Sequence, residues 1–325
     1  MTDPVFHADR RAFLAGAAAG LATGAAALPA VAATPQQGLL RPGLWRFSLG
    51  AFEVTSILDG AVQIDGPHPI FGQNVTQDDV AALAAQNFLP ATRMEVPYTV
   101  TLVNTGSALI LFDTGNGEAR RPNAGKVVER LGILGIAPGD ITHLVITHFH
   151  GDHINGLTEA GEVTYPNAEV ILGATEFDFW SNEDLLFDDA FQSRAQLVQD
   201  KVVPLAEQAR MLAPGDAVVS GIEAVNAFGH TPGHMVYHVE SEGQRLLITA
   251  DTANHYVMSL QRPDWHVVFD MDKEAAAATR KSVFGMVAAD RIPFIGYHMP
   301  APALGYVEPL GEGFRYVPAS YQLNL

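Results

Sequence analysis

One short run constrains this chain more than any other: His148-Phe149-His150-Gly151-Asp152-His153 holds three imidazoles and one carboxylate. It directly follows residues 141–146, whose apolar character predicts a buried strand. Imidazole nitrogen and carboxylate oxygen are standard ligands for zinc and similar divalent metals. The first two histidines flank one residue and can share an ion, while the aspartate and the last histidine can reach a second. The run therefore predicts a metal site, and the alternative is a polar loop with incidental histidines.

Three further ligand-type residues follow apolar stretches elsewhere in the chain. His230 comes after residues 222–228, Asp251 after residues 246–250, and His298 after residues 292–296. A rigid sheet can hold side chains that lie at the ends of its strands. A single histidine or aspartate in such a place is more often structural, but together with the first run these three predict a larger metal site.

The composition excludes several other kinds of site. The chain has no cysteine, which rules out disulfides, thiolate zinc sites and cysteine nucleophiles. A net charge of −17 disfavours nucleic acid and anionic membrane surfaces as partners. With 48% hydrophobic residues among 325, the chain can bury a sizeable core.

The N-terminal residues resemble a targeting segment. Arg10-Arg11 precede a weakly hydrophobic Ala/Gly-rich run to Leu28, and small residues up to Ala33 supply a cleavage pattern. We therefore expect a twin-arginine-type signal over residues 1–33, and a periplasmic or secreted protein. An uncleaved anchor or a disordered tail is the alternative. Residues 34–325 are expected to form a single domain without stable membrane insertion.

The rest of the chain mixes strand and helix signals. Asp59-Gly60 predicts a hairpin turn, and Thr105-Gly106 predicts a second one. Thr76 is predicted to cap a helix that ends near Gln86, and Asp272 a long Ala-rich helix. Two face-to-face sheets with helices outside them would account for this order of elements.

The complete motif set resembles the metallo-β-lactamase superfamily. It consists of Asp113-Thr114-Gly115, the run at 148–153, Gly229-His230-Thr231-Pro232-Gly233-His234, Asp251 and His298. The C-terminal third, with Asp270-Met271-Asp272-Lys273 and residues 297–305, is similar to the methyl parathion hydrolase-like branch, which includes phosphotriesterases and lactonases. This resemblance implies an α+β fold, a four-layer αββα sandwich.

The resemblance also implies a role for each motif residue. A first metal would be held by His148, His150 and His230, a second by Asp152, His153 and His298, and Asp251 would bridge the two. Asp113 would order the ligand loop by hydrogen bonds rather than bind metal. His234 is expected to be a buried, hydrogen-bonded histidine, and the role of His255 stays open.

Two divalent metals so arranged imply a hydrolase in which a metal-bridging hydroxide attacks a carbonyl or phosphoryl centre. Zinc is the first expectation, with Mn²⁺, Co²⁺ or Fe²⁺ as alternatives. Asp152 and Asp251 are the candidate catalytic residues, and Asp251 can also relay a proton.

The substrate is expected to be a small uncharged lactone, ester or organophosphate triester. Trp180 and Phe149 are the candidate pocket residues: an apolar, aromatic pocket suits such molecules, and the resemblance implies an aromatic residue at Trp180. Few Arg or Lys residues lie near the motifs in sequence, which argues against glyoxalase II-type anionic substrates. Another ester, sulfate-ester or β-lactam hydrolase, or an exported metal-binding protein without activity, is the competing interpretation, and a homodimer is left open.

Overall fold

The computed structural model describes residues 40–320, nearly all of which belong to the structural unit Arg41–Leu325. The predicted signal over residues 1–33 lies outside the described residues. Within the described part of the chain, no helix has the length and apolar character needed to cross a membrane.

Two seven-stranded sheets form the centre of this unit. The first has the order β1-β2-β3-β4-β5-β8-β9 and the second the order β10-β11-β12-β13-β14-β15-β16. The strands of the first sheet are β1 (Leu44–Leu49), β2 (Phe52–Asp65), β3 (Arg93–Asn104), β4 (Leu109–Phe112), β5 (His143–Ile146), β8 (Glu169–Gly173) and β9 (Arg210–Leu212). Those of the second are β10 (Ala217–Val219), β11 (Ile222–Asn226), β12 (Met235–Ser241), β13 (Gln244–Ala250), β14 (Phe294–Gly296), β15 (Leu304–Leu310) and β16 (Gly313–Pro318).

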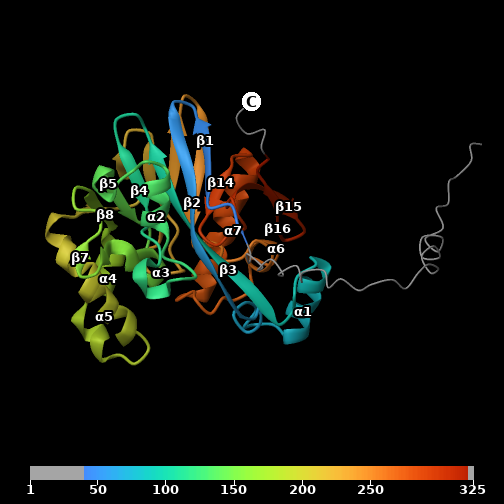
Figure 1. Cartoon of the computed structure of the whole chain (residues 1–325). Helices are drawn as coiled ribbons and strands as arrows, with labels where there is room; N and C mark the ends of the chain where they lie inside the picture. Colours follow the sequence, from blue (N-terminus) through green and yellow to red (C-terminus); the bar gives the residue numbers. More distant parts are fainter. Residues whose placement is uncertain (1–39, 321–325) are drawn as a thin grey trace, which may run out of the picture. The chain divides into compact units, whose positions relative to one another are not determined.

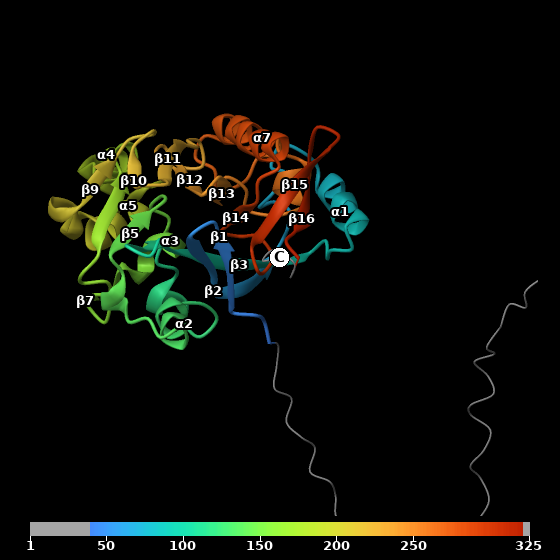
Figure 2. The same ribbon diagram turned by 90° about the horizontal axis from the view of Figure 1, so that it is seen from above.

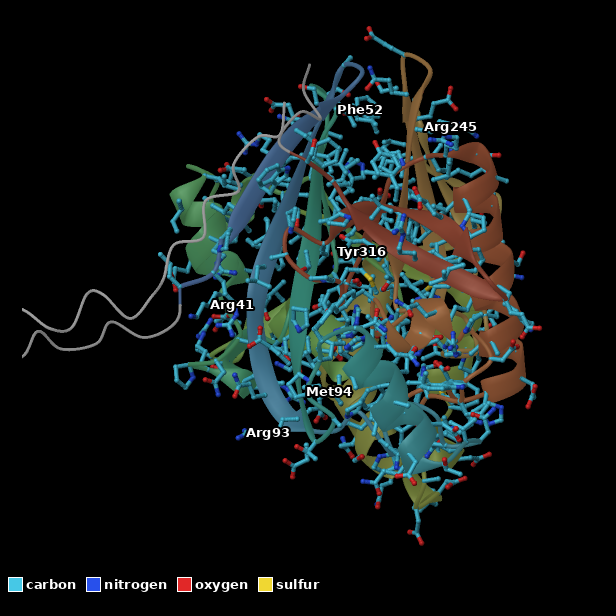
Figure 3. All side chains as sticks on the ribbon, turned by 90° about the vertical axis from the view of Figure 1, so that its right-hand side faces the viewer. Arg41, Phe52, Arg93, Met94, Arg245 and Tyr316 are labelled. Atoms are coloured by element: carbon cyan, nitrogen blue, oxygen red, sulfur yellow. The ribbon has the colours of Figure 1, made fainter. Side chains whose placement is uncertain are left out.

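Helices cover the outer faces of the two sheets, which gives the expected four layers (Figure 1; Figure 2). The helices are α1 (Gln77–Gln86), α2 (Val127–Ile133), α3 (Gly151–Ile154), α4 (Ala174–Trp180), α5 (Gln192–Lys201), α6 (Met258–Gln261) and α7 (Lys273–Asp290). Side chains fill the space between the sheets (Figure 3). The α+β sandwich predicted from the sequence is confirmed.

Two buried clusters explain the layers. One joins the facing sides of the sheets, through residues such as Val54 and Val236, and also includes Phe284 of α7. The other joins the outer face of the first sheet to α2 and α5, through residues such as Leu144 and Leu131, and also includes residues of α1 and α6. Each sheet thus buries both faces, which is why its strands are rich in consecutive apolar residues.

One turn prediction was wrong. The chain does not reverse at Asp59-Gly60, because β2 continues through both residues as a 14-residue strand with a register shift opposite β3. The buried Asp59 carboxylate instead accepts hydrogen bonds from the backbone nitrogens of Gly125, Lys126 and Val127 at the start of α2. The helix cap at Thr76 and the hairpin between β3 and β4 are confirmed.

Candidate metal centre

Strand ends from both sheets place the predicted ligands. The run at 148–153 follows β5 in the first sheet and continues into α3. His230 lies between β11 and β12, Asp251 directly follows β13, and His298 follows β14, all in the second sheet. The centre is therefore assembled across the two sheets.

The structure brings all seven predicted ligands together in two groups. One consists of His148, His150, His230 and Asp251, and the other of Asp152, His153 and His298. Within each group the potential ligand atoms lie within 4.8 Å of one another. Six of these seven side chains are buried, and Asp152 is the partly exposed one.

Asp251 faces both groups. Its Oδ2 lies 3.4 Å from His230 Nε2 and 3.1 Å from His298 Nε2. Its Oδ1 lies 3.3 Å from His153 Nε2. A carboxylate in this position can contribute one oxygen to each of two ions.

The donor set fits a pair of divalent metal ions. His150 Nε2, His153 Nε2 and Asp251 Oδ1 are buried atoms without a hydrogen-bond partner among the described residues. Leaving buried polar atoms unpaired is costly, so such atoms usually have a ligand, an ion or water as a partner. All three belong to the two groups.

The pKa shifts match ligand chemistry in the first group. Burial lowers the pKa of His148 and of His150 well below the ordinary value, with neighbouring histidines adding to the effect. Neutral imidazole is the form that binds metal. Burial opposes the ionised form of Asp251, yet His298 and His153 hold its pKa well below the ordinary value.

Asp113 fixes the ligand loop as predicted. Its Oδ1 accepts a hydrogen bond from the backbone nitrogen of Thr147 at 2.8 Å, and its Oδ2 lies 2.8 Å from His153 Nδ1. Burial opposes a charge on His153, but the carboxylates of Asp113, Asp251 and Asp152 together raise its pKa well above the ordinary value. Orienting a ligand histidine by its other ring nitrogen is a common support in metal sites.

Asp270 does the same for His230. Its Oδ1 lies 2.9 Å from His230 Nδ1, and its Oδ2 accepts a hydrogen bond from Arg280 of α7 at 2.7 Å. Burial alone would raise the pKa of Asp270, but His230 and Arg280 lower it. The sequence contained Asp270 only within a longer motif, with no spacing that assigned it a partner.

Glu176 was missed entirely. This buried residue of α4 accepts hydrogen bonds from the backbone nitrogen of Phe149 at 2.9 Å and of Gly233 at 2.8 Å. Thr231 Oγ1 and Trp180 Nε1 donate to the same carboxylate. Glu176 thus joins the loop of His148 and His150 to the loop of His230. This long-range contact cannot be predicted from the local spacing of residues.

The remaining histidines are not among the two groups. His234 is buried; its Nδ1 lies 3.0 Å from Ala227 O, and its Nε2 accepts a hydrogen bond from the Asp251 backbone, as expected of a structural histidine. Burial lowers the pKa of His255 to about 4, and its Nδ1 accepts from the backbone of Val257 and Met258.

Two cavities meet at His298. One, of about 450 Å³, is lined by His150, Asp152, Asp251 and His298. The other, of about 590 Å³, reaches only His298 among the seven predicted ligands, and Arg41, Arg93 and Met94 of its wall are labelled in Figure 3. Val62 and Ile64 line the first cavity and Gln63 the second. Successive side chains of a strand point to opposite faces, so β2 separates the two spaces. We call the smaller one the metal cavity, because four of the seven predicted ligands line it.

The two predicted pocket residues do not line either cavity. Trp180 and Phe149 are fully buried in the core cluster between the first sheet and its helices. Trp180 donates its indole hydrogen to Glu176, and the Phe149 side chain packs within the core cluster instead of lining the cavity. The expectation that they form the substrate pocket was wrong.

Other residues form the cavity wall instead. Its apolar lining residues are Val62, Ile64, Ile70, Val96 and Phe269. Its polar lining residues include Tyr98, Arg120, Asn155 and Arg194. Burial raises the pKa of Tyr98 to about 12, so its phenol stays protonated at neutral pH. The sequence did not indicate the two arginines, because they come from η1 (Gly117–Arg120) and α5, outside the motifs.

Comparison with known proteins agrees with this site. The model of the metallo-β-lactamase superfamily matches residues 93–293, more than half of the chain. The N-acyl homoserine lactonase AiiA of Bacillus thuringiensis subsp. kurstaki is 24% identical over 185 residues, which are 50% of this chain and 67% of that protein.

Solved structures extend the likeness to most of the chain. The dizinc quorum-quenching lactonase AidC, in complex with a product, has a TM-score of 0.77 at 25% identity and covers 86% of this chain and 98% of its own. The hydrolase AbOPH has a TM-score of 0.80 at 22% identity, over 87% of this chain and 99% of its own. The chain therefore belongs to the metallo-β-lactamase superfamily, as a metal-dependent hydrolase.

Proposed function

We propose that this protein hydrolyses lactones and related esters at a pair of divalent metal ions, with zinc as the resident metal. One observation carries the proposal: Asp251 lies close to both groups of ligands, beside a cavity large enough for a small ester. The names of AiiA and AidC, both lactonases, support this reaction class.

The chain's own residues prepare the site for hydrolysis. Two bound divalent ions supply a water of lowered pKa and polarise the carbonyl or phosphoryl oxygen of the substrate. Asn254 Nδ2 donates to Asp251 Oδ2 at 3.0 Å and fixes that carboxylate. The Asp152 side chain is 21% exposed and lines the metal cavity, so it can carry a proton from the attacking water to the leaving oxygen.

The cavity wall supports an ester with an apolar arm. Aliphatic and aromatic side chains from β2, β3 and Phe269 line the same cavity as the ligands. An acyl chain could contact these residues with the ester carbonyl next to the ligand side chains. N-acyl homoserine lactones are the first substrates to test, and aryl phosphotriesters are the second class.

The test uses the full chain loaded with zinc. Ring opening of N-hexanoyl homoserine lactone and hydrolysis of a diethyl 4-nitrophenyl phosphate are measured for the wild type, His148→Ala and Asp251→Asn. We expect turnover by the wild type and a loss of about 100-fold or more in both variants, because each removes a metal ligand. His238→Ala, which changes a histidine of β12 outside the centre, is the matched control. Stoichiometric binding of two metals without turnover of any ester would favour a metal-binding protein.

A further inference from the structure

Arg120 and Arg194 line the metal cavity beside the ligands. Arg120 lies at the end of η1 and Arg194 in the first turn of α5, so they are far apart in sequence. Arg120 lies 5.8 Å from the ring centre of Tyr98, and Arg194 lines the same cavity as His150. Both arginines thus border the cavity that the ligand side chains line.

Neither arginine has a carboxylate partner among residues 40–320. Most other arginines of that part of the chain do, as Arg121 with Glu159, Arg210 with Glu169 and Arg280 with Asp270 show. The carboxylates that line the metal cavity are Asp152 and Asp251, and both belong to the ligand groups. Bound metals would take up their negative charge, which leaves the arginines available to a ligand.

Two kinds of side chain line this cavity. The arginines and Asn155 come from η1, from the segment after α3 and from α5. The apolar residues come from β2 and β3, together with Ile70 and Phe269. A neutral apolar ester would use only the apolar residues. Guanidinium groups recognise carboxylate and phosphate oxygens with paired hydrogen bonds, and they do so better at a site partly shielded from water.

We propose that the protein acts on esters or lactones that carry an anionic group, such as a carboxylate, and that Arg120 and Arg194 bind this group. The proposal rests on the proposed hydrolytic function and narrows its substrate class. It reverses the expectation of an uncharged substrate, which followed from the scarcity of basic residues near the motifs. A neutral N-acyl homoserine lactone is then a poorer substrate than an otherwise similar anionic ester.

A pair of substrates with the same leaving group tests this preference. The zinc-loaded full chain is assayed with 4-nitrophenyl butyrate and with mono-4-nitrophenyl glutarate, which adds a carboxylate to the acyl arm. We expect kcat/KM for the glutarate ester to be about 10-fold or more higher than for the butyrate ester in the wild type. In the double variant Arg120→Gln/Arg194→Gln the two values should be similar. Arg194→Lys should retain part of the preference, because it keeps the charge without the planar fork. Arg262→Gln, an exposed arginine that lines neither cavity, should leave the ratio unchanged.

An equilibrium measurement decides the inference without turnover. Calorimetric titration of the zinc-loaded protein compares glutarate with butyrate, since both offer one carboxylate to the metals and only glutarate offers a second. We expect glutarate to bind about 10-fold more tightly in the wild type, and equally with butyrate in the double variant. Equal binding in the wild type, or a preference that survives in the double variant, would overturn the role of the arginines. Hydrolysis of both esters at equal rates would overturn it too while leaving the hydrolytic function intact, whereas tight glutarate binding without any hydrolysis would uphold the anion site and reject the proposed reaction.

Discussion

Asp270 couples the metal centre to the folded core through a single side chain. It holds His230 on one oxygen and Arg280 on the other, and both partners are buried. Asp270→Asn should therefore lower the free energy of unfolding by about 3 kcal/mol, because it leaves the Arg280 guanidinium without a counter-charge. The same change should weaken zinc binding by about 10-fold or more, because His230 loses its orienting acceptor. Denaturant unfolding and competition with a chromophoric chelator measure the two effects.

The control for Asp270 is a pair of the same residue types at the surface. Arg245 and Asp290 form an ion pair in which both side chains are 38% exposed. Asp290→Asn is expected to change stability by less than about 1 kcal/mol, since exposed pairs are weak. If the two variants were equally stable, the buried pair would contribute nothing specific.

His255 gives the protein an acid-sensitive stability. Its pKa falls from 6.5 to about 4 on folding because the ring is buried. Below pH 6.5 His255 binds a proton in the unfolded chain but stays neutral in the folded chain. The free energy of unfolding therefore decreases as the pH falls from 6.5 through 4. At pH 5 the loss from this group is on the order of 2 kcal/mol. His255→Asn keeps an acceptor for Val257 and Met258 but does not titrate, so the metal-free variant should lose less stability than metal-free wild type between pH 7.5 and 5. Parallel curves would show that His255 ionises freely.

The sequence motifs predicted the metal ligands correctly, but they did not predict the residues that surround those ligands. The seven ligand positions could be predicted from the sequence because each lies in a short motif directly after an apolar strand. Glu176, Arg120 and Arg194 could not, because their partners lie at distances along the chain that no local pattern encodes. Trp180 was misplaced for a related reason: an aromatic near a motif can face the core as well as the cavity, and its indole is bound by Glu176.

At the scale of elements, α4 holds two loops in place through Glu176. Its carboxylate accepts from Phe149 and Trp180 on Oε1 and from Thr231 and Gly233 on Oε2. Glu176→Gln replaces one acceptor oxygen by an amide nitrogen, which is a donor. Two of the four donors then lose their acceptor. We expect a loss of about 1–3 kcal/mol in the free energy of unfolding and weaker zinc binding, because both ligand loops lose a common anchor.

Glu183→Gln provides the comparison for α4. Glu183 is exposed at the start of the next short helix, so its change should affect neither quantity measurably. Wild-type zinc affinity in Glu176→Gln would show that Glu176 stabilises the fold without supporting the ligand loops.

Element boundaries followed the sequence where local chemistry decides them. The Thr76 side chain accepts from Asp79 N, and Asp272 accepts from Ala275 N, so both helix starts are visible as caps. Asp59-Gly60 misled because the same two residues suit a hairpin turn and a bulge. Only the distant backbone donors that Asp59 binds distinguish these outcomes.

At the scale of the whole unit, the metal centre spans the sandwich. Four of the seven ligands follow β5 of the first sheet, and the other three follow strands of the second. Bound ions would thus tie the two sheets together at one edge, in addition to the apolar cluster between them. Within the described residues, the buried atoms His150 Nε2, His153 Nε2 and Asp251 Oδ1 of this centre have no hydrogen-bond partner.

Removing metal should therefore lower stability without unfolding the sandwich. A ligand that binds only the folded state at 100 times its Kd adds about 2.7 kcal/mol to the free energy of unfolding. We expect chelator-treated protein to melt at a lower temperature, and two equivalents of zinc to restore the original value. His148→Ala should respond less to zinc than His238→Ala, because only the first variant lacks a ligand that joins the two sheets. Because the apolar cluster persists without metal, the chelated protein should keep its far-ultraviolet circular dichroism. Full unfolding on chelation would show that the ions, rather than the cluster, hold the sheets together.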